Sequence, residues 1–373
     1  MRVLMVTPGF HPIKGGTETM VRNLAIALNE IGVHTDVMTF NQEQKFKPKW
    51  ETKIEEIDGI TVFKIPGLNL LTNGHTSRIT LGVHLIPGRF TYLLKQYDII
   101  HFHEAEFSFP FFSFLVRKPK ILHLHYINYE YFKRYHLSRM ILRNVADIYI
   151  SLTRQMTKEL TELGVPENKI INLPNAVNIK SFSPKGEKEE NLLLYVGRLF
   201  SKKGVHVLLK SLRYLKKPVR LVVIGPMEST KYCQEILKLI EKLNQETKHE
   251  IKYLGPLNPG AEITRWYQKA TMLVTPSIYE AFGVVLLEAL SCETPVVATT
   301  VGGIPEIVQN HKNGLLVPPN DPLKLAEAIQ YLLDNKDIRT RMGREGRNWV
   351  TESFSLETST KKLYNIYQKL LSH

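Results

Sequence analysis

The stretch Asn191-Leu-Leu-Leu-Tyr-Val196, followed directly by Gly197-Arg-Leu-Phe-Ser-Lys-Lys-Gly204, decides the fold of this chain. A short, uninterrupted apolar run is typical of a strand buried on both faces of a sheet. The basic segment after it, bounded by glycines, predicts a loop that opens a helix. Strand–helix units of this kind recur along the chain, which predicts an α/β architecture with parallel sheets covered on both faces.

The alternation of strands and helices runs twice. The first series of strands is expected near 2–7, 34–39, 60–65, 98–103, 120–125 and 147–151. A helix over 17–31 is expected between the first two of these strands. The second series is expected near 191–196, 219–224, 251–254, 271–275 and 295–299. Pro305 and Pro322 suit the first turns of two later helices, and Asp321 suits the N-cap of the second.

The junction between the two series is expected at 173–178, ahead of a charged, proline-containing stretch at 183–190. We therefore predict two doubly wound, Rossmann-like domains, residues 1–174 and 175–355. Sheets of this kind bind ligands at the carboxyl ends of their strands, so the domains are expected to face each other across a cleft that holds the site.

The composition bounds the class of protein. At 373 residues the chain suits two domains, and its formal net charge of +13 favours anionic partners. The only two cysteines, Cys233 and Cys292, lie far apart, so we expect no disulfide framework and a reducing, cytoplasmic compartment. The apolar start is too short for a signal sequence, and no stretch reaches the roughly 20 apolar residues of a membrane span.

Arg198 and Lys203 lie in the loop that follows the strand at 191–196. Cations and backbone amides at the start of a helix favour an anion. Many enzymes that expel a nucleoside diphosphate stabilise it with a metal held by Asp-x-Asp, and this chain contains no Asp-x-Asp. We expect Arg198 and Lys203 to supply fixed positive charge instead, with no metal ion and no cofactor. The alternative is an ordinary basic surface turn.

Glu280 and Glu288 frame the string Glu280-Ala-Phe-Gly-Val-Val-Leu-Leu-Glu288. Glu280 precedes a predicted helix and is expected beside a transferred sugar, where the amides of Phe282, Gly283 and Val284 also point. Glu288 lies in the second turn of that helix and could accept from two vicinal hydroxyls, such as those of a ribose. Because the helix around it is apolar, its carboxylate needs a hydrogen-bond partner. The alternative is that Glu280 is an ordinary acidic residue at a helix N-terminus and that Glu288 is a solvated carboxylate on the surface of the helix.

Gly15 and Gly16 follow the first predicted strand and precede the first predicted helix. Glycines at this point of a strand–loop–helix unit let the backbone approach a phosphate or a sugar. We therefore count both among the candidate substrate-binding residues.

Four histidines form two His-x-His strings, His101-Phe-His103 and His123-Leu-His125, each at a predicted strand end. A period of two places each pair on one face of the sheet. A four-histidine zinc site is conceivable, but carboxylates are few nearby, so we expect one functional histidine among structural ones. His125 ends its strand and is expected to donate to a sugar hydroxyl or to a developing negative charge.

Together these motifs resemble the retaining glycosyltransferases of family 4, which have the GT-B fold. The resemblance covers nearly the whole chain and rests on the Gly15-Gly16 loop, His125, 146–151, 174–177, 197–204 and 276–288. It implies that residues 1–174 bind the acceptor, that residues 175–355 bind a nucleotide sugar, and that a last helix, 356–373, crosses back to the first domain. Ala176 and Asn178 replace the usual Gly and Asp of the family's linker, which leaves the contacts of that loop open.

The resemblance also assigns roles. It implies that Arg198 and Lys203 grip the diphosphate, that Glu280 lies beside the donor sugar, and that Glu288 binds the ribose. Gly16 would approach the donor phosphate and His125 the donor sugar.

The implied reaction takes place on one face of the sugar, with the leaving phosphate helping to deprotonate the acceptor hydroxyl. Main-chain atoms near 253–257, including Gly255 and Leu257, are expected to read the base. The sequence identifies neither the base, nor the sugar, nor the acceptor.

The acceptor is expected to be a sugar or a lipid-linked molecule. Segment 117–143 holds seven Lys and Arg residues, one acid and several aromatic residues, and segment 59–97 has no acid at all. Basic and aromatic residues together favour docking on an anionic membrane, on its inner face, as a peripheral protein. A soluble acceptor is the alternative.

Two other functions are weighed against the glycosyltransferase. A sugar phosphorylase or an epimerase would use the same architecture, and fold does not choose among them. A nucleic-acid-binding protein would explain the charge, but the chain has no recognisable reading module and its basic residues are spread over both halves, so we expect no nucleic-acid partner.

Overall fold

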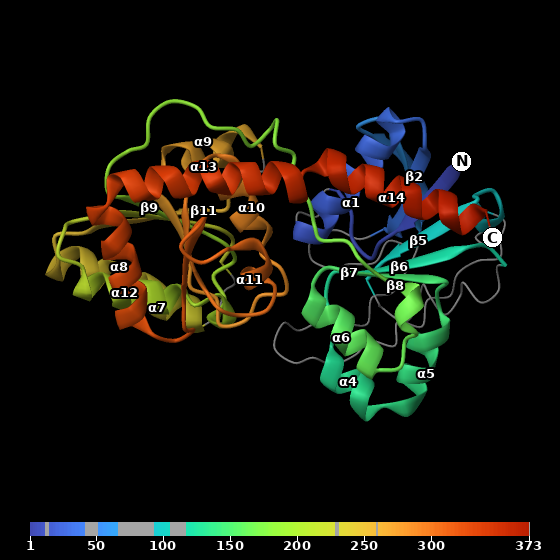
Figure 1. The fold of residues 1–373 in the computed structure, drawn as a ribbon, viewed down its shortest axis with the longest axis horizontal. Helices are drawn as coiled ribbons and strands as arrows, with labels where there is room; N and C mark the ends of the chain where they lie inside the picture. Colours follow the sequence, from blue (N-terminus) through green and yellow to red (C-terminus); the bar gives the residue numbers. More distant parts are fainter. Residues whose placement is uncertain are drawn as a thin grey trace. The chain divides into compact units, whose positions relative to one another are not determined.

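The computed structural model describes residues 1–11, 15–41, 51–65, 93–104, 117–227, 231–258 and 260–372. The chain forms two compact units (Figure 1). Unit 1 comprises Met1–Asn175 together with Leu356–His373, and unit 2 comprises Ala176–Ser355. Unit 1 thus ends one residue after the boundary expected from the sequence, and the last segment of the chain returns to it.

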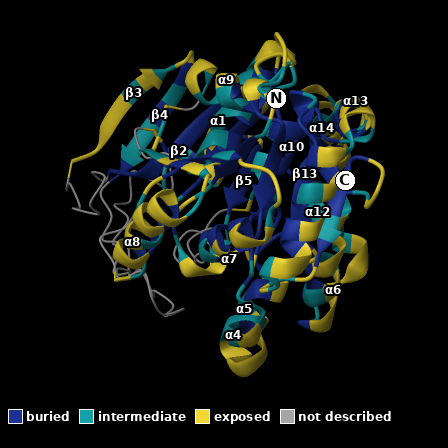
Figure 2. Ribbon diagram, turned by 90° about the vertical axis from the view of Figure 1, so that its left-hand side faces the viewer, coloured by how far each residue is buried: buried dark blue, intermediate teal, exposed yellow. Residues whose placement is uncertain are grey.

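Unit 1 is built on one eight-stranded sheet in the order β3-β4-β2-β1-β5-β6-β7-β8. Its strands are β1 (Arg2–Val6), β2 (His34–Phe40), β3 (Lys53–Ile57), β4 (Ile60–Ile65), β5 (Ile99–His103), β6 (Lys120–Leu124), β7 (Ile148–Ser151) and β8 (Ile170–Asn172). Every pairing is parallel except that of β3 with β4. β3 and β8 are not predicted from the sequence. β3 is a mostly exposed edge strand, as its yellow colour in Figure 2 shows, and it lacks the apolar run of the inner strands.

The described helices of unit 1 are α1 (Gly16–Glu30), α4 (Tyr129–Arg134), α5 (His136–Asn144), α6 (Arg154–Glu162) and α14 (Leu356–Leu371), with a 3-10 turn at Glu167–Lys169. α1 buries Val21, Leu24 and Leu28, which recur at helical spacing. The C-terminal helix α14 packs against α1, so the two ends of the sequence meet within unit 1 (Figure 1).

Unit 2 is built on a six-stranded, wholly parallel sheet in the order β11-β10-β9-β12-β13-β14. Its strands are β9 (Leu192–Val196), β10 (Arg220–Ile224), β11 (Glu250–Gly255), β12 (Met272–Thr275), β13 (Val296–Thr299) and β14 (Gly314–Val317). The direction of strand succession reverses between β9 and β12. This reversal is the topological switch point at which doubly wound sheets bind their ligands.

The helices of unit 2 cover both faces of this sheet. They are α7 (Val205–Ser211), α8 (Lys231–Glu246), α9 (Ala261–Lys269), α10 (Val284–Ser291), α11 (Ile304–Ile307), α12 (Pro322–Asp334) and α13 (Lys336–Ser353), with 3-10 turns at Ser201–Lys203 and Leu212–Tyr214. As predicted, prolines stand in the first turns of α11 and α12, and Asp321 caps α12 by accepting from the amide of Lys324 at 2.9 Å. None of the described helices is long and apolar enough to cross a membrane.

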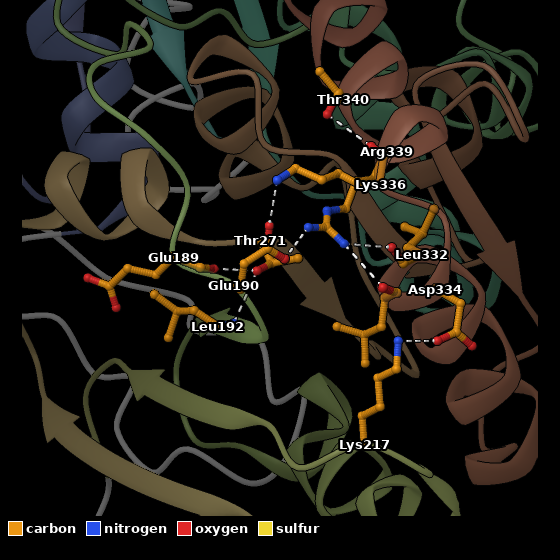
Figure 3. A network of polar contacts seen from close by, with 11 residues as sticks. Glu189, Glu190, Leu192, Lys217, Thr271, Leu332, Asp334, Lys336, Arg339 and Thr340 are labelled. Carbon is orange, nitrogen blue, oxygen red and sulfur yellow. Dashed lines mark hydrogen bonds and ion pairs between the residues drawn. The ribbon is translucent and has the colours of Figure 1, made fainter.

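A polar network ties the segment before β9 to α12 and α13 (Figure 3). The nearly buried guanidinium of Arg339 pairs with Glu190 and donates to the carbonyls of Leu332 and Leu333 at 3.3 and 3.2 Å. These carbonyls belong to the last turn of α12, where helical acceptors lack intrahelical donors. Lys336 reaches Glu190 at 3.0 Å from a side chain that is 73% exposed. Arg339 therefore satisfies a buried helix end, whereas Lys336 adds only a surface ion pair.

Replacing Arg339 with methionine should destabilise the protein by about 2–4 kcal/mol, because two helix-end carbonyls lose their donor and Glu190 keeps only the exposed Lys336. Lys336→Met removes a positive charge from the same carboxylate and should cost less than about 1 kcal/mol. Denaturant unfolding of the full chain compares the two variants. Equal losses in both would contradict the role given to Arg339.

Candidate functional site

The loops after β9 and β12 lie against each other at the switch point of unit 2. The carbonyl of Lys202, in the β9 loop, accepts from the amides of Ile278 and Tyr279, in the β12 loop, at 2.8 and 3.1 Å. Gly204 has φ 70°, and a Cβ there would lie 1.9 Å from the carbonyl oxygen of Pro276. Only glycine permits this contact, so the sequence of the basic loop fixes its position against the β12 loop.

Lys203 and Glu280 meet where these loops touch. Lys203 Nζ lies 2.6 Å from Glu280 Oε2, and Ser277 Oγ donates to the same oxygen at 3.3 Å. Gly302, with φ 51°, supports the loop from the other side, since a Cβ there would lie 1.7 Å from the carbonyl oxygen of Glu280. Glu280 is 9% exposed. The structure thus joins as an ion pair two residues that the sequence analysis assigned to different parts of a donor molecule.

Arg198 lies at the start of the same loop, two residues after β9, and is exposed. Its carbonyl accepts from the hydroxyl of Tyr195 at 3.2 Å, which fixes the backbone of the loop. The β9 loop therefore offers an exposed guanidinium and a partly buried ammonium, as an anion site requires.

The segment after Glu280 turns directly into α10. Gly283 is its N-cap, with φ 102°, and Phe282 beside it is buried. Val284 begins the helix. Because the first amides of a helix have no intrahelical acceptor, the start of α10 presents donors next to the Lys203–Glu280 pair.

Glu288 lies in the second turn of α10, as predicted, and its partner is Tyr267 of α9. The hydroxyl of Tyr267 donates to Glu288 Oε2 at 2.6 Å. Burial raises the pKa of Glu288 to about 7, and the Tyr267 hydrogen bond opposes that rise. Glu288 is therefore a carboxylate that gains or loses its charge near neutral pH.

Lys188 fixes the elements that carry Tyr267 and Glu288. Its ammonium donates to the carbonyls of Tyr267 and Cys292 at 3.1 and 2.9 Å and to the hydroxyl of Thr294 at 2.5 Å. Burial lowers the pKa of Lys188 to about 8. The sequence analysis missed Lys188 and Tyr267 because neither stands in a recognisable motif; the only signal was that Glu288 needed a partner.

Gly255 ends β11, and Leu257 follows it in a half-buried loop. The carbonyl of Gly255 accepts from the amide of Gly225 at 3.0 Å, and Tyr253 donates to the carbonyl of Gly225 at 2.9 Å. These contacts join the carboxyl ends of β10 and β11. The part of the main chain expected to read a base therefore lies at the same edge of the sheet as the β9 loop.

In unit 1 the two glycines before α1 differ. A Cβ on Gly15 would lie 2.2 Å from Glu18 Oε2, so the protein's own carboxylate lies against this glycine. A Cβ on Gly16 would meet no described atom within 4 Å. Thr17 also donates to Glu104 Oε1 at 3.0 Å, which joins the start of α1 to the end of β5. Among the described residues, the space beside Gly16 is therefore open, whereas Glu18 occupies the space beside Gly15, which was not predicted from the sequence.

His125 follows β6 and is buried against the other three histidines rather than standing apart from them. Its Nε2 lies 3.0 Å from His103 Nδ1. Burial lowers the pKa of His125 to about 4, and the side chain of Asn175 acts in the opposite direction. His125 is therefore neutral at physiological pH and can donate through only one ring nitrogen.

The chain matches two family models that together span most of its length. The model described as Glycosyltransferase Family 4 matches residues 14–181, and the model described as Glycosyl transferases group 1 matches residues 178–349. The chain belongs to the group 1, family 4 glycosyltransferases. It is an enzyme of the transferase class.

Curated relatives match over the full length. An uncharacterized glycosyltransferase of Methanocaldococcus jannaschii is 24% identical, with 99% of this chain and 98% of the relative covered. A D-inositol 3-phosphate glycosyltransferase of Corynebacterium urealyticum is 28% identical, with 99% and 96% covered.

Solved structures agree on the fold. Anabaena HepE in complex with UDP has a TM-score of 0.79 at 18% identity, covering 99% of this chain and all of that one. Sucrose-phosphate synthase from Thermosynechococcus elongatus has a TM-score of 0.76 at 22% identity, and both chains are covered completely. The predicted GT-B fold, with two Rossmann-like domains, is confirmed.

Proposed function

We propose that this glycosyltransferase moves a sugar from a nucleoside diphosphate sugar to a hydroxyl acceptor, with retention at the anomeric carbon and without a divalent ion at the diphosphate. The observation that carries the proposal is the Lys203 ammonium, held by Glu280 at the switch point of unit 2 beside the exposed Arg198. Anabaena HepE, which shares the fold, was solved with UDP and with UDP-glucose.

In this proposal the donor binds along the strand ends of unit 2. Arg198 and Lys203 hold the diphosphate, Glu288 accepts from the ribose, and the main chain at Gly255 and Leu257 reads the base. Glu280 and the first amides of α10, from Phe282 to Val284, contact the transferred sugar. In unit 1, Gly16 and His125 are the residues that we propose contact the donor phosphate and the donor sugar.

The proposed reaction depends on stabilising the negative charge that develops on the leaving diphosphate. The bond between the anomeric carbon and the diphosphate oxygen breaks, and the acceptor oxygen bonds to that carbon on the same face. The proton of the acceptor hydroxyl passes to the leaving phosphate. Negative charge grows on the diphosphate, and fixed cations that need no reorganisation lower the barrier. The 2.6 Å contact with Glu280 orients the Lys203 ammonium.

Product stereochemistry tests this proposal. Purified protein is incubated with a panel of nucleotide sugars, UDP-glucose first, and simple sugar acceptors, and the products are followed by proton NMR. We expect at least one α-linked donor to give an α-linked product without added metal. A β-linked product would exclude retention, and consumption of no donor in the panel would count against transferase activity toward these substrates.

For the acceptor we propose a lipid-linked molecule or a glycan reached from the inner face of an anionic membrane. In unit 1, α5 exposes Leu137 and Met140, and Tyr135 is exposed between α4 and α5; Leu137 is 64% exposed. Figure 2 shows mainly exposed residues over these two helices. Lys133 and Arg134 are exposed on α4 beside the aromatic rings of Tyr129 and Tyr135. Apolar side chains rimmed by cations suit a surface of acidic headgroups.

Not all of the aromatic segment belongs to this surface. Phe132 is buried, and the hydroxyl of Tyr129 donates to Glu162 at 2.7 Å. The expected surface on 59–97 lies largely outside the described residues. In unit 2 the two cysteines are buried free thiols, which suits the reducing cytoplasm.

The protein should co-sediment with anionic vesicles at low salt and lose most of that binding at high salt. Lys133→Gln together with Arg134→Gln should weaken partitioning roughly 10–30-fold, since each cation near such a surface contributes about 1 kcal/mol. Leu323→Ser alters an exposed apolar residue of unit 2 and serves as the control. Failure to bind anionic vesicles at low salt would remove the membrane proposal and leave the transfer reaction untouched.

A further inference from the structure

The four histidines of the His-x-His strings form one buried stack in unit 1. β5 and β6 are adjacent parallel strands, with His103 paired in register with His123. Ring centroids of neighbouring histidines lie 4.3 to 5.5 Å apart. His101, His103 and His123 are at most 1% exposed.

The hydrogen bonds of the stack leave ring nitrogens without partners. His101 Nδ1 lies 2.7 Å from the hydroxyl of Tyr367 on α14, and His103 Nδ1 lies 3.0 Å from His125 Nε2. Among the described residues, Nε2 of His101 and of His103 has no hydrogen-bond partner, and neither nitrogen of His123 has one. Buried polar atoms in native proteins almost always have a partner, so this concentration calls for a bound species.

The geometry suits one small cation. One ring nitrogen from each of His101, His103 and His123 lies within 4.8 Å of the other two. Metal–nitrogen bonds of about 2.0–2.1 Å place tetrahedral ligands roughly 3.4 Å apart, so the three nitrogens need to close by at most about 1.5 Å. The three ring planes are inclined by only 8° to 32° to one another, so binding also has to turn the in-plane lone pairs toward one point. Rotation about χ2, which is a broad torsion in histidine, is the movement that does both.

The two hydrogen bonds favour the ring tautomer that a metal ligand needs. A metal-bound histidine donates its other ring N–H to a second group, which fixes its tautomer. With the proton on Nδ1, His101 donates to Tyr367 and His103 donates to His125, and both Nε2 lone pairs remain for a ligand. These are the same two atoms that lack partners among the described residues.

We propose that His101, His103 and His123 bind one transition-metal ion of the Zn²⁺ class, with Tyr367 and His125 holding two of the rings in place. Three neutral imidazoles favour Zn²⁺, Co²⁺ or Ni²⁺ over Mg²⁺ and Ca²⁺, which prefer oxygen. The fourth position falls to water or another small ligand. The ion would tie β5 and β6 to α14 through Tyr367 and has no step in the proposed sugar transfer. The sequence analysis set a zinc site aside for want of carboxylates; the unpartnered nitrogens are the observation that changes this.

The experiment uses full-length, untagged protein, because a histidine tag would itself bind the ion. Metal is removed by dialysis against a chelator, the chelator is removed, and Zn²⁺, Co²⁺ or Mg²⁺ is added. We expect about one Zn²⁺ per chain, visible d–d bands with Co²⁺ that report nitrogen coordination, and a raised melting temperature with Zn²⁺ but not with Mg²⁺.

Two variants and a matched control locate the site. His101→Gln and His123→Gln should each weaken Zn²⁺ binding at least tenfold and abolish the Co²⁺ bands. His206→Gln is the control, since His206 in unit 2 makes a similar contact, with its Nδ1 2.9 Å from the hydroxyl of Tyr232. It should bind the metal as the wild type does.

If either cluster variant fails to fold, the wild-type titration still decides. If the wild type took up no stoichiometric Zn²⁺, the proposal would be overturned and the stack would be assigned to buried water. Full Zn²⁺ uptake by both cluster variants would also overturn it. No donor or acceptor enters the experiment, so its outcome is independent of the proposed transfer reaction.

Discussion

Lys203→Ala should lower kcat/KM for donor turnover about 10²–10³-fold, because it removes a preorganised cation from the charge that develops on the leaving diphosphate. Binding of the free nucleoside diphosphate should weaken roughly 10–100-fold, since hydrogen bonds between charged groups contribute about 1.5–3 kcal/mol. Steady-state kinetics measure the first effect and calorimetry the second.

Lys202→Ala is the matched control. Lys202 is the exposed neighbour in the same loop, and its carbonyl accepts from Ile278 and Tyr279, a contact that alanine retains. Alanine removes only an ammonium that lies 5.4 Å from the centroid of the Tyr279 ring. This variant should keep most of the donor affinity. Equal losses in both variants would show that only the general positive charge of the loop matters.

The Lys203 variant also leaves Glu280, 9% exposed, without its cation. Lys203→Met combined with Glu280→Gln removes both charges and separates this structural cost from the loss of binding. The double variant should unfold at a higher denaturant concentration than Lys203→Met alone and should still bind the diphosphate weakly. Recovery of wild-type affinity in the double variant would contradict the role given to Lys203.

Donor affinity should fall as the pH is lowered through about 7, the pKa of Glu288. In the proposed complex the ionised carboxylate accepts from two ribose hydroxyls, and the protonated form loses one acceptor. The affinity should therefore fall about tenfold in all as the carboxylate takes up its proton, with the midpoint of the fall near that pKa. Glu288→Gln should bind the donor roughly tenfold more weakly at pH 8 and lose the pH dependence.

Tyr267→Phe tests whether the pH profile follows the pKa of Glu288, because this variant changes the pKa and keeps the carboxyl group. The Tyr267 hydroxyl lowers the pKa of Glu288, so its removal should move the midpoint of the pH profile upward and leave the profile present. An unchanged profile in Glu288→Gln would assign the titration to another group.

The same carboxyl group predicts an opposite effect on stability. Its pKa in the folded protein is raised from 4.5 to about 7, so the folded state binds the proton more tightly than the unfolded chain. The stabilisation is fully present below about pH 4.5 and is lost as the pH rises through about 7. Glu288→Gln should therefore gain about 1–3 kcal/mol over the wild type at pH 8, after allowance for partial exposure, and little at pH 4. A variant less stable than the wild type at pH 8 would contradict this prediction.

Much of the fold follows from the sequence because the inner strands are buried on both faces. β9, Leu192–Val196, is an uninterrupted apolar run and was predicted within a residue. β3 reads Lys-Ile-Glu-Glu-Ile, and its charges suit an exposed edge, so it carries no strong strand signal. β8 has only three residues, too short for a periodicity to register. β14, a four-residue edge strand that begins at Gly314, was not predicted either.

The site was predictable as a set of residues but not as a set of contacts. The sequence indicated that Glu288 needs a partner, yet Tyr267 lies 21 residues away on another helix and only packing brings it there. Lys203 and Glu280 are 77 residues apart and meet because β9 and β12 are neighbours in the sheet. The period-two rule placed each histidine pair on one face, but the stacking of all four depends on the register of β5 with β6.

The most direct test of the central claim is a calorimetric titration of wild-type protein with nucleoside diphosphates, UDP first, in the presence of EDTA. The account predicts saturable binding of at least one nucleoside diphosphate, with an affinity that EDTA leaves unchanged and that Lys203→Ala weakens roughly 10–100-fold. Binding that appears only when Mg²⁺ or Mn²⁺ replaces EDTA, or that is the same in Lys203→Ala, would contradict it.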